Sequence, residues 1–384
     1  MIIERNITNL IEETLGKEPK IIILYGPRQA GKTTLLNLLL QKINQNEVAI
    51  FNGDDLRTQE VFSQAKLDSL KNAIGSKKYL VIDEAQRIAN IGLSLKLLFD
   101  SLKIKIIVSG SSSFELANQI NEPLTGRATT FFLYPMALGE LQPVLPDVSL
   151  NSRLEEFLRF GMYPKVLSTD GVQDKERYLF DLVNNYLYKD IISFENVRKP
   201  KKVVDLLSLL ALQIGQEVSV AELSKHLALS KPVVEKYLDL LEKMFVIINL
   251  RGFSRNLRKE IYKTSKYYFT DLGLRNGLIR NFNPMNLRND NGALLENFFL
   301  IEKMKDLNNS GRFANFYFWR TYDQKEIDFI EERDGRLFAY EVKWRNEKTK
   351  PPKEWLENYP AAEFSTVNTQ NFFDFFQKNL HKTE

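Results

Sequence analysis

Gly26-Pro-Arg-Gln-Ala-Gly31-Lys32-Thr33 stands between the apolar run IIILY at 21–25 and the helical stretch KTTLLNLLLQKI at 32–43. It fits G-x-x-x-x-G-K-[ST] at every fixed position, and a preceding strand and a following helix are the setting that this loop requires. The glycines let the backbone curl so that its N–H groups, with the positive end of the helix, cradle phosphate. The sequence therefore predicts a P-loop that binds ATP or ADP.

The residues of this loop have distinct expected roles. We expect Lys32 to reach the β- and γ-phosphates and the Thr33 hydroxyl to hold Mg²⁺. A glycine-rich loop that binds nothing is the alternative, but a chance match would not also supply the strand and the helix. The predicted cofactor-binding residues of the loop are Gly26, Pro27, Arg28, Gln29, Ala30, Gly31, Lys32, Thr33 and Thr34.

A second part of the site is predicted at Leu80-Val-Ile-Asp83-Glu84, where an apolar strand ends in two acids. We expect Asp83 to hold the Mg²⁺ shell as both a metal and a cofactor-binding residue. Glu84 is then placed to orient and activate a water for attack on the γ-phosphate. A solvated pair of acids at the end of a strand is the alternative interpretation.

Short apolar runs alternate with longer helical patterns over residues 20–134. The runs are IIILY at 21–25, VAIF at 48–51, YLVID at 79–83, KIIVS at 105–109 and TTFFLY at 129–134. Such runs, separated by helices, predict buried parallel strands in a three-layer α/β domain. We assign residues 1–137 to a P-loop ATPase core and residues 138–199 to a mostly helical lid.

Two further features lie near the strands of this core. Ser109-Gly110-Ser111 ends the fourth strand, where ligands of parallel sheets bind, so a hydroxyl there could sense the γ-phosphate. Capping of the following helix is an equally good reason for these serines. Arg127 precedes the fifth strand and is a candidate arginine finger for the ATP of a neighbouring subunit, which implies a homo-oligomer. A surface salt bridge is the alternative for Arg127.

At this point a resemblance becomes specific. The stretches GPRQAGKTTLL, LVIDEAQRI, VSGSSSFEL and LTGRATTFFLYPMALGEL resemble the AAA+-related prokaryotic ATPases that carry a DUF4143-type C-terminal region. RFGMYPKVL at 159–167, YLYKDI at 186–191 and YYFTDLGLRNGLI at 267–279 are similar to the same family. The resemblance implies that Ser111 or Ser112 is a sensor and Arg127 the finger. It also implies that the segment from Gly161 to Pro164 lies near the adenine, although Met162 replaces the glycine that members often have there.

Composition bounds the remaining possibilities. The chain has 384 residues and no cysteine, which excludes disulfides and thiolate metal sites. No apolar run approaches the ~20 residues that span a bilayer, so we expect no membrane association and, by default, a cytoplasmic location. Residues 198–280 hold 16 Lys and Arg against 8 Asp and Glu, although the whole chain carries only +4. This basic middle predicts an anionic partner there.

The basic middle also has the pattern of a winged helix-turn-helix, which we place at residues 200–280. Two short helical patterns around Ser230 are followed by FVIINLRGFSRNLRKEIYKTSKYYFTD, which predicts two strands around a basic tip. DNA is the predicted partner, and a winged helix that only contacts protein is the alternative. The predicted phosphate contacts are Lys231, Lys236, Arg251, Arg255, Arg258, Lys259 and Lys263.

Acids and one lysine recur in the last part of the chain, residues 281–384. Glu296 lies in a helical pattern, Asp328 in the first strand of a hairpin that turns at Asp334-Gly335, and Glu341 and Lys343 on one face of the second strand. Three acids near a lysine predict a site for a hard cation such as Mg²⁺. A half-exposed hairpin with alternating polar residues is the alternative.

This constellation resembles the PD-(D/E)xK nuclease core in the version with a helical glutamate. The resemblance implies that Glu296, Asp328 and Glu341 are metal ligands, that Asp328 and Glu341 act with the metal in catalysis, and that Lys343 is the catalytic lysine. The combined hypothesis is an ATP-hydrolysing AAA+-like protein that acts on DNA through a Mg²⁺-dependent nuclease module. The alternatives are a non-cutting regulator and a signalling ATPase whose basic region contacts a protein.

Overall fold

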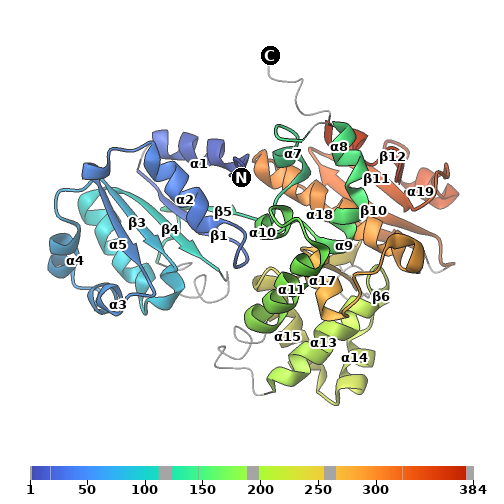
Figure 1. The fold of residues 1–384 in the computed structure, drawn as a ribbon, viewed down its shortest axis with the longest axis horizontal. Helices are drawn as coiled ribbons and strands as arrows, with labels where there is room; N and C mark the ends of the chain where they lie inside the picture. Colours follow the sequence, from blue (N-terminus) through green and yellow to red (C-terminus); the bar gives the residue numbers. More distant parts are fainter. Residues whose placement is uncertain are drawn as a thin grey trace.

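The computed structural model describes residues 2–17, 19–111, 123–145, 147–187, 199–254, 265–321 and 323–377. Figure 1 shows two parts: residues up to β5 in blue and cyan form one, and the later residues in green to red form the other. The N-terminus lies between these two parts.

The first part is built on a five-stranded parallel sheet. Its strands, in spatial order, are β2 (Val48–Asn52), β3 (Tyr79–Asp83), β4 (Lys105–Gly110), β1 (Ile21–Tyr25) and β5 (Ala128–Phe132). These are the five apolar runs predicted as parallel strands, so that prediction is confirmed. β1 is buried along its whole length because it lies between two other strands and beneath helices on both faces.

Helices cover both faces of this sheet. Because side chains alternate along a strand, Ile22 and Leu24 face α1 (Ile7–Gly16) and α2 (Lys32–Gln41), whereas Ile21 and Ile23 face the opposite layer. That layer consists of α3 (Leu56–Ser63), α4 (Leu67–Ile74) and α5 (Ile91–Leu102). Short 3₁₀ turns lie at Gln45–Glu47 and Ala85–Arg87. The three layers predicted for the core are therefore present.

Mostly helical segments follow. The region predicted as a lid contains α7 (Leu138–Leu141), α8 (Asp147–Ser152), α9 (Leu154–Phe160), α10 (Pro164–Leu167), α11 (Val172–Leu182) and a π-helical turn at Val183–Leu187. The basic middle contains α13 (Pro200–Leu212), β6 (Glu217–Val218), α14 (Val220–Leu227), α15 (Lys231–Lys243), β7 (Ile247–Gly252), β8 (Ser265–Phe269) and α17 (Leu272–Leu278). The element order of this middle agrees with the order predicted for the winged helix.

The C-terminal elements begin after a 3₁₀ turn at Met285–Leu287. They are α18 (Asn291–Asn309), β9 (Asn315–Arg320), β10 (Glu326–Arg333), β11 (Arg336–Lys343), α19 (Lys353–Asn358), β12 (Glu363–Asn368) and α20 (Asp374–Gln377). The hairpin predicted at Asp334-Gly335 is confirmed: both residues have positive φ, 51° and 73°, and Arg333 pairs with Arg336 across the turn.

One sheet joins the basic middle to the C-terminal part. Its seven strands have the order β12-β11-β10-β9-β7-β8-β6, and β7 pairs in parallel with β9 through Arg251 and Gly252. α18 packs against β8 and β11, and one hydrophobic core runs from Met136 to Phe376 through the lid, the basic middle and the C-terminal part. The segments predicted as a winged helix and as a separate C-terminal domain therefore share one sheet and one core.

Candidate functional site

The P-loop connects β1 to α2 at the carboxyl edge of the first sheet. Gly31 has φ 100° and caps α2, a backbone conformation that residues with a Cβ rarely adopt. At Gly26 the chain leaving β5 passes so close that an added Cβ would lie 2.1 Å from the Leu133 carbonyl oxygen. Both glycines of the predicted motif are therefore required by the observed backbone.

Lys32 is buried at the start of α2, with 5% of its surface exposed. Its ammonium folds back over the loop and donates to the carbonyl oxygens of Gly26 at 2.9 Å and Pro27 at 3.0 Å. The charge is thus held at the concave side of the loop, where a phosphate anion would be bound.

Asp83 is the last residue of β3, and its side chain contacts the P-loop. One carboxylate oxygen accepts from the Thr33 hydroxyl at 2.7 Å, and the other accepts from the Glu84 N–H at 3.0 Å and from the Ser109 hydroxyl. The Thr33 and Asp83 oxygens are hard donors of the kind that Mg²⁺ prefers, and they lie together beside the loop. These two residues therefore fit a Mg²⁺ ion bound with the nucleotide.

Glu84 is fixed in an unusual backbone conformation beside Asp83. Its φ is 53°, and its carbonyl packs against Gly53, where an added Cβ would lie 2.1 Å from the Glu84 oxygen. The Gln86 side-chain amide donates to the Glu84 carboxylate at 2.6 Å and to the Ser111 hydroxyl at 3.0 Å. Ser111 is buried behind Glu84, so Gln86, which sequence reasoning did not single out, joins the predicted sensor to the predicted base.

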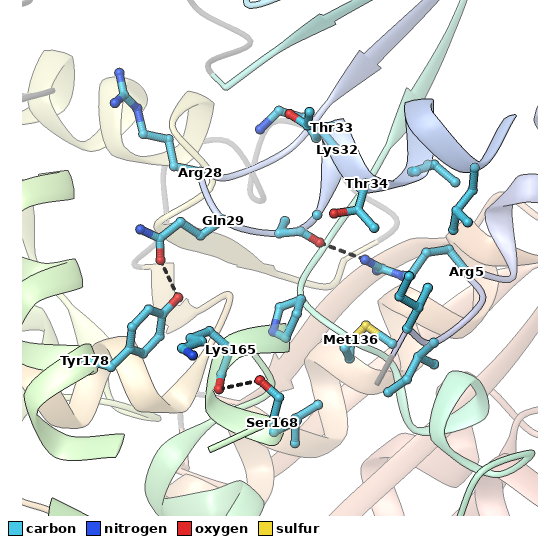
Figure 2. A pocket seen from close by; sticks show the side chains of 18 of the residues that line it. Arg5, Arg28, Gln29, Lys32, Thr33, Thr34, Met136, Lys165, Ser168 and Tyr178 are labelled. Atoms are coloured by element: carbon cyan, nitrogen blue, oxygen red, sulfur yellow. Dashed lines mark hydrogen bonds between the residues drawn. The ribbon is translucent and has the colours of Figure 1, made fainter. Parts of the chain in front are cut away.

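A cavity of about 850 Å³ opens in front of the P-loop (Figure 2). One wall is polar and contains the loop residues from Arg28 to Thr34 together with Glu84. The other walls come from the N-terminal segment, α2, the segment after β5 and the lid. Their residues are Ile2, Ile3, Arg5, Leu35, Leu38, Met136, Pro164, Lys165, Leu167, Ser168 and Tyr178.

The cavity has room for a nucleotide. Pro164, predicted near the adenine, lines it, whereas Gly161 is buried against the Asp271 side chain. The N-terminal residues Ile2 and Ile3 were not predicted in the site. Nothing in their local sequence distinguishes them from ordinary residues before a helix.

Lid residues reach across the cavity to the P-loop (Figure 2). The Tyr178 hydroxyl on α11 donates to the Gln29 side-chain oxygen, and Gln29 itself has φ 62°. Lys165 on α10 is exposed and lines the same side of the cavity. Burial raises the pKa of the Tyr178 hydroxyl well above its ordinary value, so the hydroxyl keeps its proton for this bond.

Arg5, from the segment before α1, is buried against the P-loop. It donates to the Ala30 carbonyl at 2.8 Å and to the Tyr134 carbonyl at 2.7 Å, and its Nε pairs with the Glu140 carboxylate at 3.0 Å. Sequence reasoning missed this residue because its partners lie 25 to 135 positions away.

Arg127 lies at the start of β5, on the edge of the sheet opposite the P-loop. Its guanidinium binds both oxygens of Asp100, at 2.8 and 3.0 Å, and this contact lowers the pKa of the Asp100 carboxyl. Its backbone carbonyl accepts from the N–H of Ile21, the first residue of β1. Arg127 is therefore remote from the P-loop of its own chain and forms the surface salt bridge that was the alternative interpretation.

In the C-terminal part, the predicted acids lie near a lysine that was not predicted there. Glu296 on α18 accepts from the Tyr268 hydroxyl and, at 3.4 Å, from the ammonium of Lys266, which is 2% exposed. The same ammonium pairs with Glu326. Both Lys266 and Tyr268 come from β8, so the shared sheet brings the basic middle into this cluster.

The other predicted ligands are already bound by the protein. Asp328 accepts from the Val342 N–H at 2.8 Å, and Glu341 pairs with Lys343 at 2.5 Å. Burial raises the pKa of Glu296 to about 7, and burial raises the pKa values of Asp328 and Glu341 as well. Among the described residues, no group of three or more Asp, Glu, His or Cys side chains is arranged to hold a metal ion.

The three-acid metal site predicted from Glu296, Asp328 and Glu341 is therefore not formed in this structure. The physical reason is that Lys266 supplies a positive charge from within the chain. A divalent cation would have to displace the ammonium or accept its repulsion.

The predicted phosphate-binding cations are only partly described. Lys231 and Lys236 are exposed on α15, and Arg251 is exposed on β7. α15 follows α14 after a turn in which Ala228 has φ 51°. The remaining predicted contacts, Arg255, Arg258, Lys259 and Lys263, lie outside the described residues, as does Ser112.

Comparison with protein families identifies the first part. A family model described as "AAA domain" matches residues 18–142. Residues 18–142 are thus similar to an AAA domain. Two models described as domains of unknown function, DUF8612 and DUF4143, match residues 151–285 and 291–380. The resemblance to AAA-type ATPases with a DUF4143 region is confirmed at this level, and one model spans both the lid and the basic middle.

Individual proteins are similar to most of the chain. An uncharacterized protein of Mycobacterium tuberculosis is 28% identical over 349 residues, which is 89% of this chain and 74% of the relative. One of Methanocaldococcus jannaschii is 25% identical over 353 residues, covering 86% and 76%. The solved Walker-type ATPase of Pyrococcus abyssi is 19% identical with a TM-score of 0.51, covering 72% of this chain and 96% of that chain. This likeness shows the fold.

Within the described ranges, every helix is too short or too polar to cross a bilayer.

Proposed function

We propose that this chain binds ATP with Mg²⁺ and hydrolyses it to ADP and phosphate. The observation that carries the proposal is the contact between Thr33 and Asp83, 2.7 Å apart, next to Lys32 and Glu84 at one cavity. This contact brings together a loop that can bind phosphate, the Thr33 and Asp83 oxygens that can bind Mg²⁺, and the Glu84 carboxylate that can orient a water. Lys32, Thr33 and Glu84 line one cavity, and Asp83 contacts Thr33 beside it, which supports an ATPase site better than a loop for a simple anion.

The side chains divide the work by their chemistry. The Lys32 ammonium exchanges its two loop carbonyls for phosphate oxygens, which offer a stronger charge-assisted bond. Mg²⁺, held by Thr33 and Asp83 when it is bound, neutralises phosphate charge. Glu84 accepts a hydrogen bond from the attacking water and orients it, while the Gln86 amide holds the Glu84 carboxylate in place.

Nucleotide binding is tested with Lys32→Ala. We expect isothermal titration with Mg²⁺ and ADP to show binding in the wild type and at least a tenfold loss in the variant, because a charge-assisted bond to phosphate is removed. Lys20→Ala, just before β1 and remote from the loop, is the matched control and should bind as the wild type does. Equal affinity of wild type and Lys32→Ala would contradict the proposal.

The trans role predicted for Arg127 stays part of the proposal. A residue at the opposite edge of the sheet can complete a nucleotide site only in a neighbouring subunit, so this role requires a homo-oligomer. It also requires the Arg127 guanidinium to leave Asp100, and an exposed ion pair of this kind contributes little to stability.

For the C-terminal acids we favour the non-cutting alternative. Lys266 pairs with Glu296 and with the neighbouring Glu326, and Lys343 pairs with Glu341, so two of the three predicted ligands are compensated without a metal. Cleavage by the predicted Mg²⁺-dependent nuclease module would need these contacts to open. On this proposal the C-terminal part binds a partner or supports the shared sheet and does not cut.

A second candidate function, DNA binding, is favoured by the exposed cations of the basic middle. Lys231 and Lys236 project from the second helix of a helix–turn–helix arrangement, the element that enters the major groove in proteins of that kind. Arg251 is exposed on the adjoining strand β7. The ATPase would then act on DNA, with ATP state controlling how the basic middle holds it.

A further inference from the structure

Arg5 is a buried side chain at the nucleotide cavity that makes hydrogen bonds to three separate segments. Three of its N–H groups bind three different segments: the P-loop at Ala30, the exit of β5 at Tyr134 and the lid at Glu140. Figure 2 shows the guanidinium reaching the loop from the side opposite Tyr178. Arg5 is 7% exposed, so these contacts replace water almost completely.

The Glu140 carboxylate likewise makes several hydrogen bonds. Its carboxylate is buried and accepts from the Asn6 N–H at 3.1 Å, the Ala137 N–H at 2.8 Å and the Asn309 amide at 3.4 Å in addition to Arg5. Asn309 ends α18, the helix that carries Glu296. The pair therefore connects the P-loop, the lid and the C-terminal part at one point.

A buried ion pair is a poor source of stability, because desolvation of two charges offsets most of their attraction. A pair of apolar residues could join the same segments at lower cost. The distinctive property of a guanidinium is its planar fork, which fixes the direction of each acceptor as well as its distance. The geometry of those acceptors therefore indicates what Arg5 does.

The decisive acceptor is the Ala30 carbonyl. A trans peptide is planar, so the Ala30 C=O and the Gly31 N–H point in opposite directions from one rigid plane. Arg5 holds the Ala30 oxygen at 2.8 Å and lies directly beside Gly31, where an added Cβ would be 3.7 Å from its Nη1 atom. By fixing the carbonyl toward itself, Arg5 turns the Gly31 N–H away from itself.

The Gly31 N–H belongs to the phosphate cradle of a P-loop. We propose that Arg5 is a positioning residue for the nucleotide: it aims the Gly31 N–H at the phosphates before they arrive, and Glu140 holds Arg5 in the orientation that does so. The proposal rests on the proposed nucleotide binding and adds to it a group outside the P-loop motif. A donor aimed in advance loses little freedom on binding, which raises affinity for phosphate.

The experiment measures ADP affinity with Mg²⁺ by isothermal titration for wild type, Arg5→Met, Arg5→Lys and Lys32→Ala, at a temperature where circular dichroism shows each to be folded. Arg275→Met is the matched control. Arg275 is also buried, binds the Ala211 carbonyl at 2.8 Å and pairs with Asp290 at 2.5 Å, but does not line the cavity. It reports what the loss of a buried arginine does to the fold alone.

We expect Arg5→Met to weaken ADP binding about tenfold, the effect of losing one well-aligned hydrogen bond to a charged ligand. Arg5→Lys should fall in between, since an ammonium cannot hold three acceptors in a plane. Arg275→Met should lose thermal stability yet bind ADP within about twofold of the wild type.

The outcomes separate the two proposals. Wild-type binding that Lys32→Ala does not weaken would overturn the nucleotide site itself. Wild-type binding that Lys32→Ala abolishes, with Arg5→Met within twofold of wild type, would overturn only the role of Arg5. If Arg5→Met fails to fold, Arg5→Lys decides: an affinity equal to that of the wild type would contradict the positioning role.

Discussion

Lys266 changes the interpretation of the acids that were predicted to bind a metal ion. Its ammonium lies between Glu296 and Glu326, on a strand 30 residues before the first of the predicted acids. Burial lowers the pKa of the Lys266 ammonium, but the attraction of the Glu296 and Glu326 carboxylates outweighs it and raises the pKa above its ordinary value. The lysine is therefore charged. The acids are thus arranged around a cation that the chain provides.

Replacement of Lys266 by Met should therefore destabilise the protein by roughly 3–5 kcal/mol at pH 8, the usual cost of a buried charge left without its partner. The deficit should shrink toward pH 5. Glu296 has a folded pKa of about 7, above its unfolded value, so the folded state takes up a proton as the pH falls and the uncompensated charge disappears. Urea unfolding at both pH values measures this.

Lys325→Met is the control for that comparison, because Lys325 forms an exposed pair with Glu354. Its effect on the free energy of unfolding should be much smaller than that of Lys266→Met at pH 8 and should not change with pH. A deficit for Lys266→Met that is equally small, or that does not change with pH, would contradict the compensating role of the ammonium.

Single residues also mark the limit of sequence reasoning. Gly26, Gly31, Lys32, Thr33, Asp83 and Glu84 were predicted together because a contiguous loop and a strand end have fixed local chemistry. Arg5, Gln86 and Lys266 were not, since their roles depend on partners far along the chain or on a neighbouring strand. No local pattern distinguishes such residues from ordinary surface cations and amides.

At the level of elements, the strand β7 has the widest consequences. It pairs with β8 as a hairpin would, but its other edge pairs with β9, and Arg251 is opposite Tyr317. The hairpin was predictable from the alternation of its own residues. Its pairing with a strand more than sixty positions later was not, because register between distant strands leaves no periodic signal in either segment.

The DNA hypothesis can be tested at the exposed cations of α15 and β7. Replacing Lys231, Lys236 and Arg251 together by Ala should weaken DNA binding and reduce the slope of log affinity against log salt by about three, if each cation contacts one phosphate. Fluorescence anisotropy with duplex DNA over a range of salt concentrations measures both quantities.

A matched control removes the same charge elsewhere. Lys17, Lys66 and Lys103 are exposed on the first part of the protein, and their triple Ala variant should leave the slope nearly unchanged. Equal affinity and slope in all three proteins would assign the basic middle to contacts with protein.

In the whole molecule, the part built on the five-stranded sheet contacts a second part whose residues share one hydrophobic core. Phe245, which follows α15, packs on Phe132 and Tyr134 at the exit of β5. Asn308 of α18 donates to the Phe132 carbonyl at 2.8 Å, and Lys305 donates to the carbonyl of Met136, a cavity residue, at 2.9 Å. Changes at the nucleotide cavity therefore have direct contacts through which to reach both α15 and α18.

ATP turnover by Glu84→Gln tests the central claim most directly. If Glu84 orients the attacking water, the variant should bind ATP as the wild type does and hydrolyse it about 100-fold more slowly, the usual loss for a positioned base. Binding by titration and phosphate release under saturating ATP and Mg²⁺ are measured on the same preparation, with Glu60→Gln, a surface change on α3, as control. Equal phosphate release by wild type and Glu84→Gln would contradict the account.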